Sequence, residues 1–204
     1  AFCIGLNKTG TTSIKQTFED HGFIVGKQGV AQGLLYDYEK RNFKTIIKYC
    51  KYAEAFQDAP FSYLYTFIIL DHFFPKSKFI LTIRDSAEEW YNSLIRFHSR
   101  AFRQNNRIPT ADDLKKAKRA FNRTVYRNMK TRFDVEDADM YNKEKLINYY
   151  EHYNQSVIDY FKFRSNLLVI NLKDKNSYKK FCDFLNIEPI YQKFPWENKS
   201  VITD

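Results

Sequence analysis

The sequence predicts an α/β fold, a three-layer sandwich in which a central, mostly parallel sheet is flanked by helices. Three short apolar runs, at 2–6, 78–83 and 167–172, have the length and composition of buried strands. Segments with helical periodicity follow these runs, and strands that alternate with helices form parallel sheets covered on both faces. We predict one domain over residues 1–204, in which about 100–143 form a helical insertion or cap.

Periodicity and boundary signals predict the remaining elements. A further strand is expected at 53–58, and helices are expected after residue 13, at 34–51, at 62–74, from residue 86, at 144–163 and at 176–186. The helix that begins at Ser86 has a capping box, Ser86-Ala87-Glu88-Glu89, and places Trp90, Leu94 and Phe97 on its buried face. Residues 100–143 are rich in Lys, Arg, Asp and Asn and poor in strand formers, which favours a helical or solvated excursion.

Composition excludes several classes of protein. With 44% hydrophobic and 18% aromatic residues among 204, disorder is not expected. The formal net charge of +9 attracts anions of any kind, so charge alone does not choose among nucleotides, sulfated sugars, nucleic acid and membranes. The three cysteines have no paired spacing and the four histidines form no H-x-x-x-H pair, so neither a disulfide framework nor a metal site is expected. No apolar run reaches membrane-spanning length.

The first strand runs directly into a loop that has the features of an anion-binding site. Gly5-Leu6-Asn7-Lys8-Thr9-Gly10-Thr11-Thr12-Ser13 lies between a predicted strand and a predicted helix. In that setting, glycines let the backbone wrap an oxyanion, and the N–H groups at the helix N-terminus point at it. The hydroxyl groups and the Lys8 charge add further donors.

The position of Lys8 separates this loop from an ordinary triphosphate loop. That pattern is G-x-x-x-x-G-K-[ST], whose lysine follows the second glycine and reaches the β- and γ-phosphates. Here Thr11 follows Gly10, and the lysine stands two residues before that glycine. Lys8 therefore lies where it can reach a single anionic group that is being transferred.

This loop resembles the 5′-phosphosulfate loop of sulfotransferases that use 3′-phosphoadenosine 5′-phosphosulfate (PAPS). The resemblance implies that Lys8 is the catalytic lysine, which contacts the transferring group and the bridging oxygen. It also implies that the 5′ side of PAPS binds to the residues Thr9, Gly10, Thr11, Thr12 and Ser13. The reaction would release adenosine 3′,5′-bisphosphate and would need no metal.

A second motif of the same family lies in the middle of the chain. In the family, an arginine at a strand end and a serine on the next helix bind the 3′-phosphate, and Ile83-Arg84-Asp85 followed by Glu89-Trp90-Tyr91-Asn92-Ser93 resembles a branch with an R-D…W-Y-x-S pattern. The resemblance implies that Arg84 and Ser93 bind this phosphate, since an arginine offers a planar fork to phosphate oxygens. The gap from Arg84 to Ser93 is nine residues instead of the usual eight, and one extra residue before the helix would absorb the difference.

The general base is expected above the sulfuryl group, where the family has a His, Glu or Asp. Asp58 lies at the carboxyl end of the predicted strand 53–58 and begins an Asp-x-Pro pattern that resembles the same branch. We expect Asp58 to take the proton of a hydroxyl acceptor, although Asp and Pro also favour turns. His98, His21 and His72 are weaker candidates for the base.

The resemblance extends to the C-terminus, where 167–172, a helix and Phe194-Pro195-x-x-Asn198 are similar to the family's closing segment. The glycine-bearing nucleotide loop of many cytosolic members is absent, and residues 193–199 are expected to replace it. The acceptor, acidic or carbohydrate, would be shaped by residues 28–45 and 100–143. Two alternatives stay open: a P-loop kinase or nucleotide triphosphatase, and a non-catalytic protein that binds polyanions.

Location and partners follow from the same observations. We expect a nucleotide co-substrate and an acceptor as partners, with no nucleic acid and no membrane span in this chain. Four N-x-[ST] sequons occur, and a glycan on Asn7 would block the loop, so a cytoplasmic location is expected. An anchor upstream of Ala1 and a Golgi lumenal location stay open as alternatives.

Overall fold

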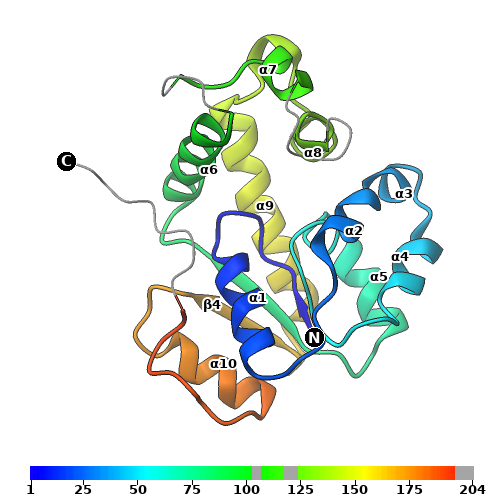
Figure 1. Cartoon of the computed structure of the whole chain (residues 1–204), viewed down its shortest axis with the longest axis vertical. Coiled ribbons are helices and arrows are strands. Elements are labelled where there is room, and N and C mark those ends of the chain that lie inside the picture. The colour runs from blue at the N-terminus through cyan, green and yellow to red at the C-terminus, as the bar shows by residue number, and fades with distance from the viewer. Residues whose placement is uncertain (103–106, 117–123, 196–204) are drawn as a thin grey trace.

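The computed structural model describes residues 1–102, 107–116 and 124–195, and its centre is a parallel sheet (Figure 1). The sheet has the order β2-β1-β3-β4 and consists of β1 (Phe2–Cys3), β2 (Phe56–Gln57), β3 (Phe79–Ile83) and β4 (Leu167–Asn171). All three neighbouring pairs are parallel, and β3 and β4 pair over five residues. The predicted α/β class with a sheet flanked by helices is therefore confirmed.

Helices cover both faces of this sheet. They are α1 (Thr11–Asp20), α2 (Gln28–Gly33), α3 (Leu35–Glu39), α4 (Phe43–Tyr49), α5 (Thr66–Phe73), α6 (Ala87–Ala101), α7 (Ala111–Lys116), α8 (Thr124–Phe133), α9 (Lys143–Phe161) and α10 (Ser177–Leu185). The pleat sends alternate strand residues to opposite faces. Phe2 and Phe79 enter a large core with residues of α5 and α9, whereas Cys3 and Ile80 enter a smaller core with residues of α1 and α10.

Several predicted elements are shorter than expected or are broken. The strand predicted at 2–6 comprises Phe2–Cys3 only, although the Ile4 N–H group still donates to the Ile80 carbonyl at 2.8 Å. The helix predicted at 34–51 is wrong as one element, because the chain turns at Arg41 (φ 56°) between α3 and α4. The helix α2 was not expected. Phe97 is also not buried, since 46% of its surface is exposed.

The stretch 100–143 is helical where the structure describes it. It contains α7, α8 and a short 3₁₀ helix, Asp137–Asp139, and Figure 1 shows α7 and α8 beside the ends of α6 and α9. The division of the chain into one domain with an insertion stays a prediction. The segment 193–199, expected to replace a nucleotide loop, lies mostly outside the described residues.

Two further features concern the chain as a whole. Cys3, Cys50 and Cys182 are all buried and unpaired. Within the described ranges, no helix has both the length and the apolar character that a membrane span requires.

Candidate active site

The loop between β1 and α1 is fastened to the neighbouring strand β3. A Cβ atom on Gly5 would lie 2.0 Å from Thr82 Oγ1 and 2.7 Å from the Thr82 carbonyl oxygen, so only glycine lets the two segments approach this closely. The Thr9 hydroxyl donates to the Leu6 carbonyl at 2.6 Å and lies 2.5 Å from Thr82 Oγ1. The Thr9 hydroxyl thus holds the loop itself, and the expected contact of Thr9 with the donor stays a prediction.

The loop ends in a helix N-terminus suited to an anion. Gly10 has φ 104°, in the left-handed region that favours glycine, and α1 begins at Thr11. The N–H groups of the first turn of a helix have no acceptor within the helix, and Gly10 has no side chain that could cap them. Thr11 and Ser13 are buried, whereas Thr12 is exposed. The first turn of α1 therefore offers backbone donors together with the positive end of the helix dipole.

Lys8 combines an unusual backbone with a partly buried charge. Its φ of 72° lies in the left-handed region, and its Nζ atom is 3.7 Å from the centre of the Phe97 ring. Burial and, to a smaller extent, the positive charge of Arg84 lower the pKa of Lys8 to about 8, and the charge of Asp58 offsets part of the shift. Lys8 therefore stays mostly protonated at pH 7, and its charge interacts with those of Arg84 and Asp58.

Donors from other segments hold the backbone of this loop. Arg84 Nε donates to the Lys8 carbonyl at 2.7 Å, and Trp90 Nε1 donates to the Asn7 carbonyl at 2.9 Å. Tyr150 in turn accepts a bond from the Arg84 N–H group at 2.9 Å. Sequence reasoning placed Trp90 on the buried face of its helix but missed these bonds. Only a general rule could have suggested these bonds from the sequence: a buried Trp N–H or Tyr O–H group usually has a hydrogen-bond partner.

Ser93 lies on the side of α6 that faces the loop. It is buried, three residues after Trp90 and four residues before Phe97, and both of these residues contact the loop. Residues three and four apart share one helix face. Three residues, 84–86, connect β3 to α6, and Ser86 caps the helix by accepting the Glu89 N–H group at 3.1 Å. The nine-residue gap thus leaves Ser93 on the same side of the molecule as Arg84.

Asp58 follows β2 at the same edge of the sheet. It has φ 61°, and its Oδ1 atom accepts the Ala59 N–H group at 2.8 Å. Burial raises the pKa of the Asp58 carboxyl group, and the charge of Arg132, the Ala59 bond and Lys8 offset part of the rise. Lys8, Asp58 and Arg132 therefore form one electrostatic cluster.

The histidines fit a catalytic role less well. His98 Nδ1 is 2.7 Å from Tyr141 Oη, and burial, helped by Lys8, lowers the pKa of His98 to about 3, so its ring is neutral near pH 7. His21 follows the C-terminal end of α1, far from the loop that precedes α1. His72 lies near the C-terminal end of α5, in a hollow that Asp71, Arg164 and Asn166 also line. Asp58 is thus the best placed candidate for the base.

Arg132 is a functional candidate that sequence reasoning missed. It lies on α8, within the stretch that we expected to be solvated, yet only 7% of its surface is exposed. A lysine- and arginine-rich stretch gives no signal that one of its cations is buried. Among the described residues, no group of three or more His, Cys, Asp and Glu side chains could hold a metal ion.

Fold and site together define an α/β protein with a candidate anion-binding loop at the carboxyl edge of a parallel sheet. The family comparison identifies this protein further: a model described as "Sulfotransferase domain" matches residues 1–201, and the chain belongs to this sulfotransferase family. Membership implies a nucleotide sulfate donor and an acceptor, and it favours sulfotransfer over the kinase and polyanion-binding alternatives. A search of curated proteins finds no match.

Proposed function

We propose that this sulfotransferase uses PAPS as its donor and transfers the sulfuryl group to a hydroxyl or amine acceptor by in-line displacement. The observation that carries this proposal is the bond from Arg84 Nε to the Lys8 carbonyl, which joins the two anion-binding elements into one unit. PAPS carries a 5′-phosphosulfate and a 3′-phosphate, so a donor with two separated anionic groups fits two adjoining cationic elements.

Each residue has a distinct part in the proposed reaction. The first turn of α1 and the residues Thr9 to Ser13 hold the 5′-phosphosulfate, while Arg84 and Ser93 hold the 3′-phosphate. Asp58 accepts the proton of the acceptor as the acceptor oxygen or nitrogen bonds to sulfur. Lys8 stabilises the charge that develops on the bridging oxygen as its bond to sulfur breaks, and adenosine 3′,5′-bisphosphate leaves.

Calorimetry with three nucleotides tests the donor. Adenosine 3′,5′-bisphosphate should bind more tightly than adenosine 5′-monophosphate, because only the former engages Arg84, and ATP with magnesium should bind weakly. Arg84→Ala should remove most of this preference. Equal affinity for the two adenosine phosphates in the native protein, or preference for ATP with magnesium, would contradict the proposal.

Replacing Lys8 tests the chemical step. Lys8→Met should lower transfer of labelled sulfate from PAPS by about 10²- to 10³-fold, the usual loss when one transition-state donor is removed. Its affinity for adenosine 3′,5′-bisphosphate should stay close to that of the native protein, since that product lacks the sulfuryl group. Lys15→Met is the matched control, because Lys15 pairs with Glu19 on the outer side of α1 at 2.7 Å. Full activity in Lys8→Met would refute the assigned role.

The cysteines and one sequon support our prediction of a cytoplasmic location. All three cysteines are buried as free thiols, as in proteins of reducing compartments. The Asn7 Oδ1 atom is sealed from solvent, and its carbonyl oxygen is bonded to Trp90, so a glycan there is incompatible with the loop. Fractionation of cells that contain the protein, combined with endoglycosidase treatment to detect any glycan, tests this location; a glycosylated protein in the lumenal fraction would contradict it.

A further inference from the structure

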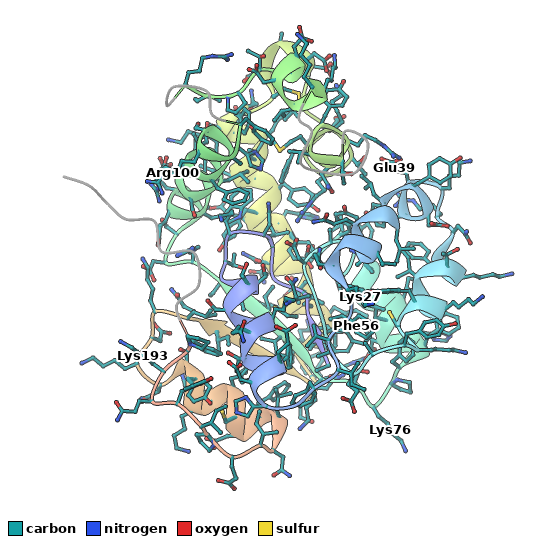
Figure 2. The ribbon with its side chains drawn as sticks, in the orientation of Figure 1. Lys27, Glu39, Phe56, Lys76, Arg100 and Lys193 are labelled. Atoms are coloured by element: carbon teal, nitrogen blue, oxygen red, sulfur yellow. The ribbon has the colours of Figure 1, made fainter. Side chains whose placement is uncertain are left out.

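The helix α8 brings a cation into the core beside the proposed base. Glu39 on α3 accepts bonds from Arg127 and, at 2.7 Å, from Thr131, so it fastens the outer side of α8 (Figure 2 labels Glu39 where α3 approaches α8). Arg132 follows Thr131 directly and turns inward, where it is buried. The stretch 100–143 therefore contributes a charged side chain to the interior.

As far as the structure describes the chain, the buried guanidinium group of Arg132 has a donor without a partner and no counter-charge in contact with it. A guanidinium group has five N–H donors, and the bond that this one makes to backbone is to the Ser62 carbonyl, at a long 3.3 Å. Its Nε atom is sealed from solvent and has no partner. In the part of the chain that the structure describes, no carboxylate oxygen lies within 4.0 Å of it. Buried charges are normally paired, because desolvation without a counter-charge is costly.

Aromatic rings surround this guanidinium. The ring centres of Tyr63, Phe133 and Tyr149 lie 5.2, 5.6 and 6.0 Å from its central carbon. Such contacts stabilise a buried cation only partly. The Tyr149 hydroxyl group is a hydrogen-bond partner of the guanidinium group, but it is neutral, so none of these side chains supplies a counter-charge. The rings fix the position of Arg132, but they leave an oxyanion as the missing partner.

One backbone turn connects this guanidinium to the proposed base. The Ser62 N–H group donates to the Asp58 carbonyl at 3.0 Å, and the Ser62 carbonyl accepts the Arg132 bond. Among the charges that act on Asp58, that of Arg132 has the largest effect. Asp58 already accepts the Ala59 N–H group and lies outside ion-pair distance of Arg132. An acceptor whose hydroxyl or amine group meets Asp58 would thus present its other groups to Arg132.

We infer that Arg132 binds an oxyanion of the acceptor, so that the enzyme sulfates a hydroxyl or amine group of an acidic molecule that carries a carboxylate, phosphate or sulfate. This inference rests on the proposed function, because it takes Asp58 as the base. An oxyanion fits the planar fork of a guanidinium and neutralises its charge. A neutral acceptor would leave the buried cation without its partner.

Nuclear magnetic resonance of the arginine Nε–H groups tests this inference. The protein is first saturated with adenosine 3′,5′-bisphosphate, which occupies the donor site, and is then titrated with sodium phosphate, sodium acetate or the neutral isostere acetamide. The Arg132 signal, assigned with Arg132→Lys, should shift saturably with both anions and not with acetamide. Arg132→Gln should weaken anion binding by about tenfold or more, as expected for loss of a charge-assisted bond.

Arg127→Gln is the matched control, because Arg127 lies on the same helix but pairs with Glu39 at the surface. This variant should bind both anions as the native protein does. The inference would be overturned if the Arg132 signal does not shift with either anion, or if the Arg132→Gln variant binds anions with native affinity. Arg132 would then have a structural role only. If Arg132→Gln does not fold, the titration of the native protein decides. Failure of adenosine 3′,5′-bisphosphate to bind in the first step would instead count against the proposed donor.

Discussion

Affinity for PAPS should fall as the pH rises from 7 to 9, because Lys8 loses its proton in this range. Burial and the charge of Arg84 hold the pKa of Lys8 at about 8 in the donor-free protein. The side chain is then about nine-tenths protonated at pH 7 and about one-tenth protonated at pH 9. The protonated form binds the anionic donor, so the stabilising charge is present below this pKa and is lost above it. The dissociation constant of PAPS should rise about tenfold over these two pH units.

Calorimetric titration with PAPS between pH 6.5 and 9.5 measures this change, at constant ionic strength because salt screens charge interactions. Other buried groups of the site titrate elsewhere: the pKa of Cys3 is raised to about 12 by burial, and that of His98 is lowered to about 3. Lys8→Arg is the control, since a guanidinium group stays charged throughout the range. A flat profile in the native protein, or the same fall in Lys8→Arg, would refute this reasoning.

Three further predictions concern the loop and the base. Gly5→Ala should lower the free energy of unfolding by about 3 kcal/mol, measured by urea denaturation, because its Cβ atom would meet Thr82 Oγ1 at 2.0 Å and force β1 away from β3; a loss below about 1 kcal/mol would show that the strands part easily. Trp90→Phe keeps an aromatic side chain but removes the N–H donor to the Asn7 carbonyl, so it should lower the free energy of unfolding by about 1–3 kcal/mol, measured by thermal unfolding, and weaken binding of adenosine 3′,5′-bisphosphate; unchanged nucleotide affinity would show that this bond does not support the site. Asp58→Asn should lower transfer to hydroxyl acceptors by about 10²- to 10⁴-fold with unchanged nucleotide affinity, since Asn tolerates the same left-handed backbone; activity equal to that of the native protein would move the base elsewhere.

Local patterns were enough to predict the sheet and the position of the loop. The apolar run before Gly5 predicts the strand in which it lies, and the hydroxyl-rich segment after Lys8 predicts the loop and the start of the next helix. These signals are local, so strand, loop and helix could be inferred in order. Asp58 and Arg84 each lie at the end of a predicted strand, and the structure places both at one edge of the sheet, where ligands of parallel sheets bind. The family match over residues 1–201 confirms the prediction of a sulfotransferase.

Contacts between distant segments could not be predicted in this way. The bond from Trp90 to the Asn7 carbonyl joins residues 83 apart, and neither local sequence carries a signal for the other. Helical periodicity placed Phe97 on the buried face of its helix but could not show what covers that face. In the structure, Lys8 lies over the Phe97 ring. The burial of Arg132 could not be predicted for the same reason, since two of the rings around it, those of Tyr63 and Tyr149, come from distant segments.

In the proposed donor site, the ion pairs around Arg84 leave the Nη edge of its guanidinium group available to the 3′-phosphate. Glu89 Oε1 is 3.4 Å from Arg84 Nη1 but 2.6 Å from Lys173 Nζ, so most of its charge is already neutralised by the lysine. Lys173 also bonds Asp85 at 2.9 Å, which removes a second carboxylate from competition. Arg84 Nε is engaged by the Lys8 carbonyl, and this bond fixes the guanidinium plane while leaving the Nη edge in a long, weak contact. A phosphate that displaces Glu89 therefore exchanges a poor ion pair for a good one without disturbing the loop that holds Lys8.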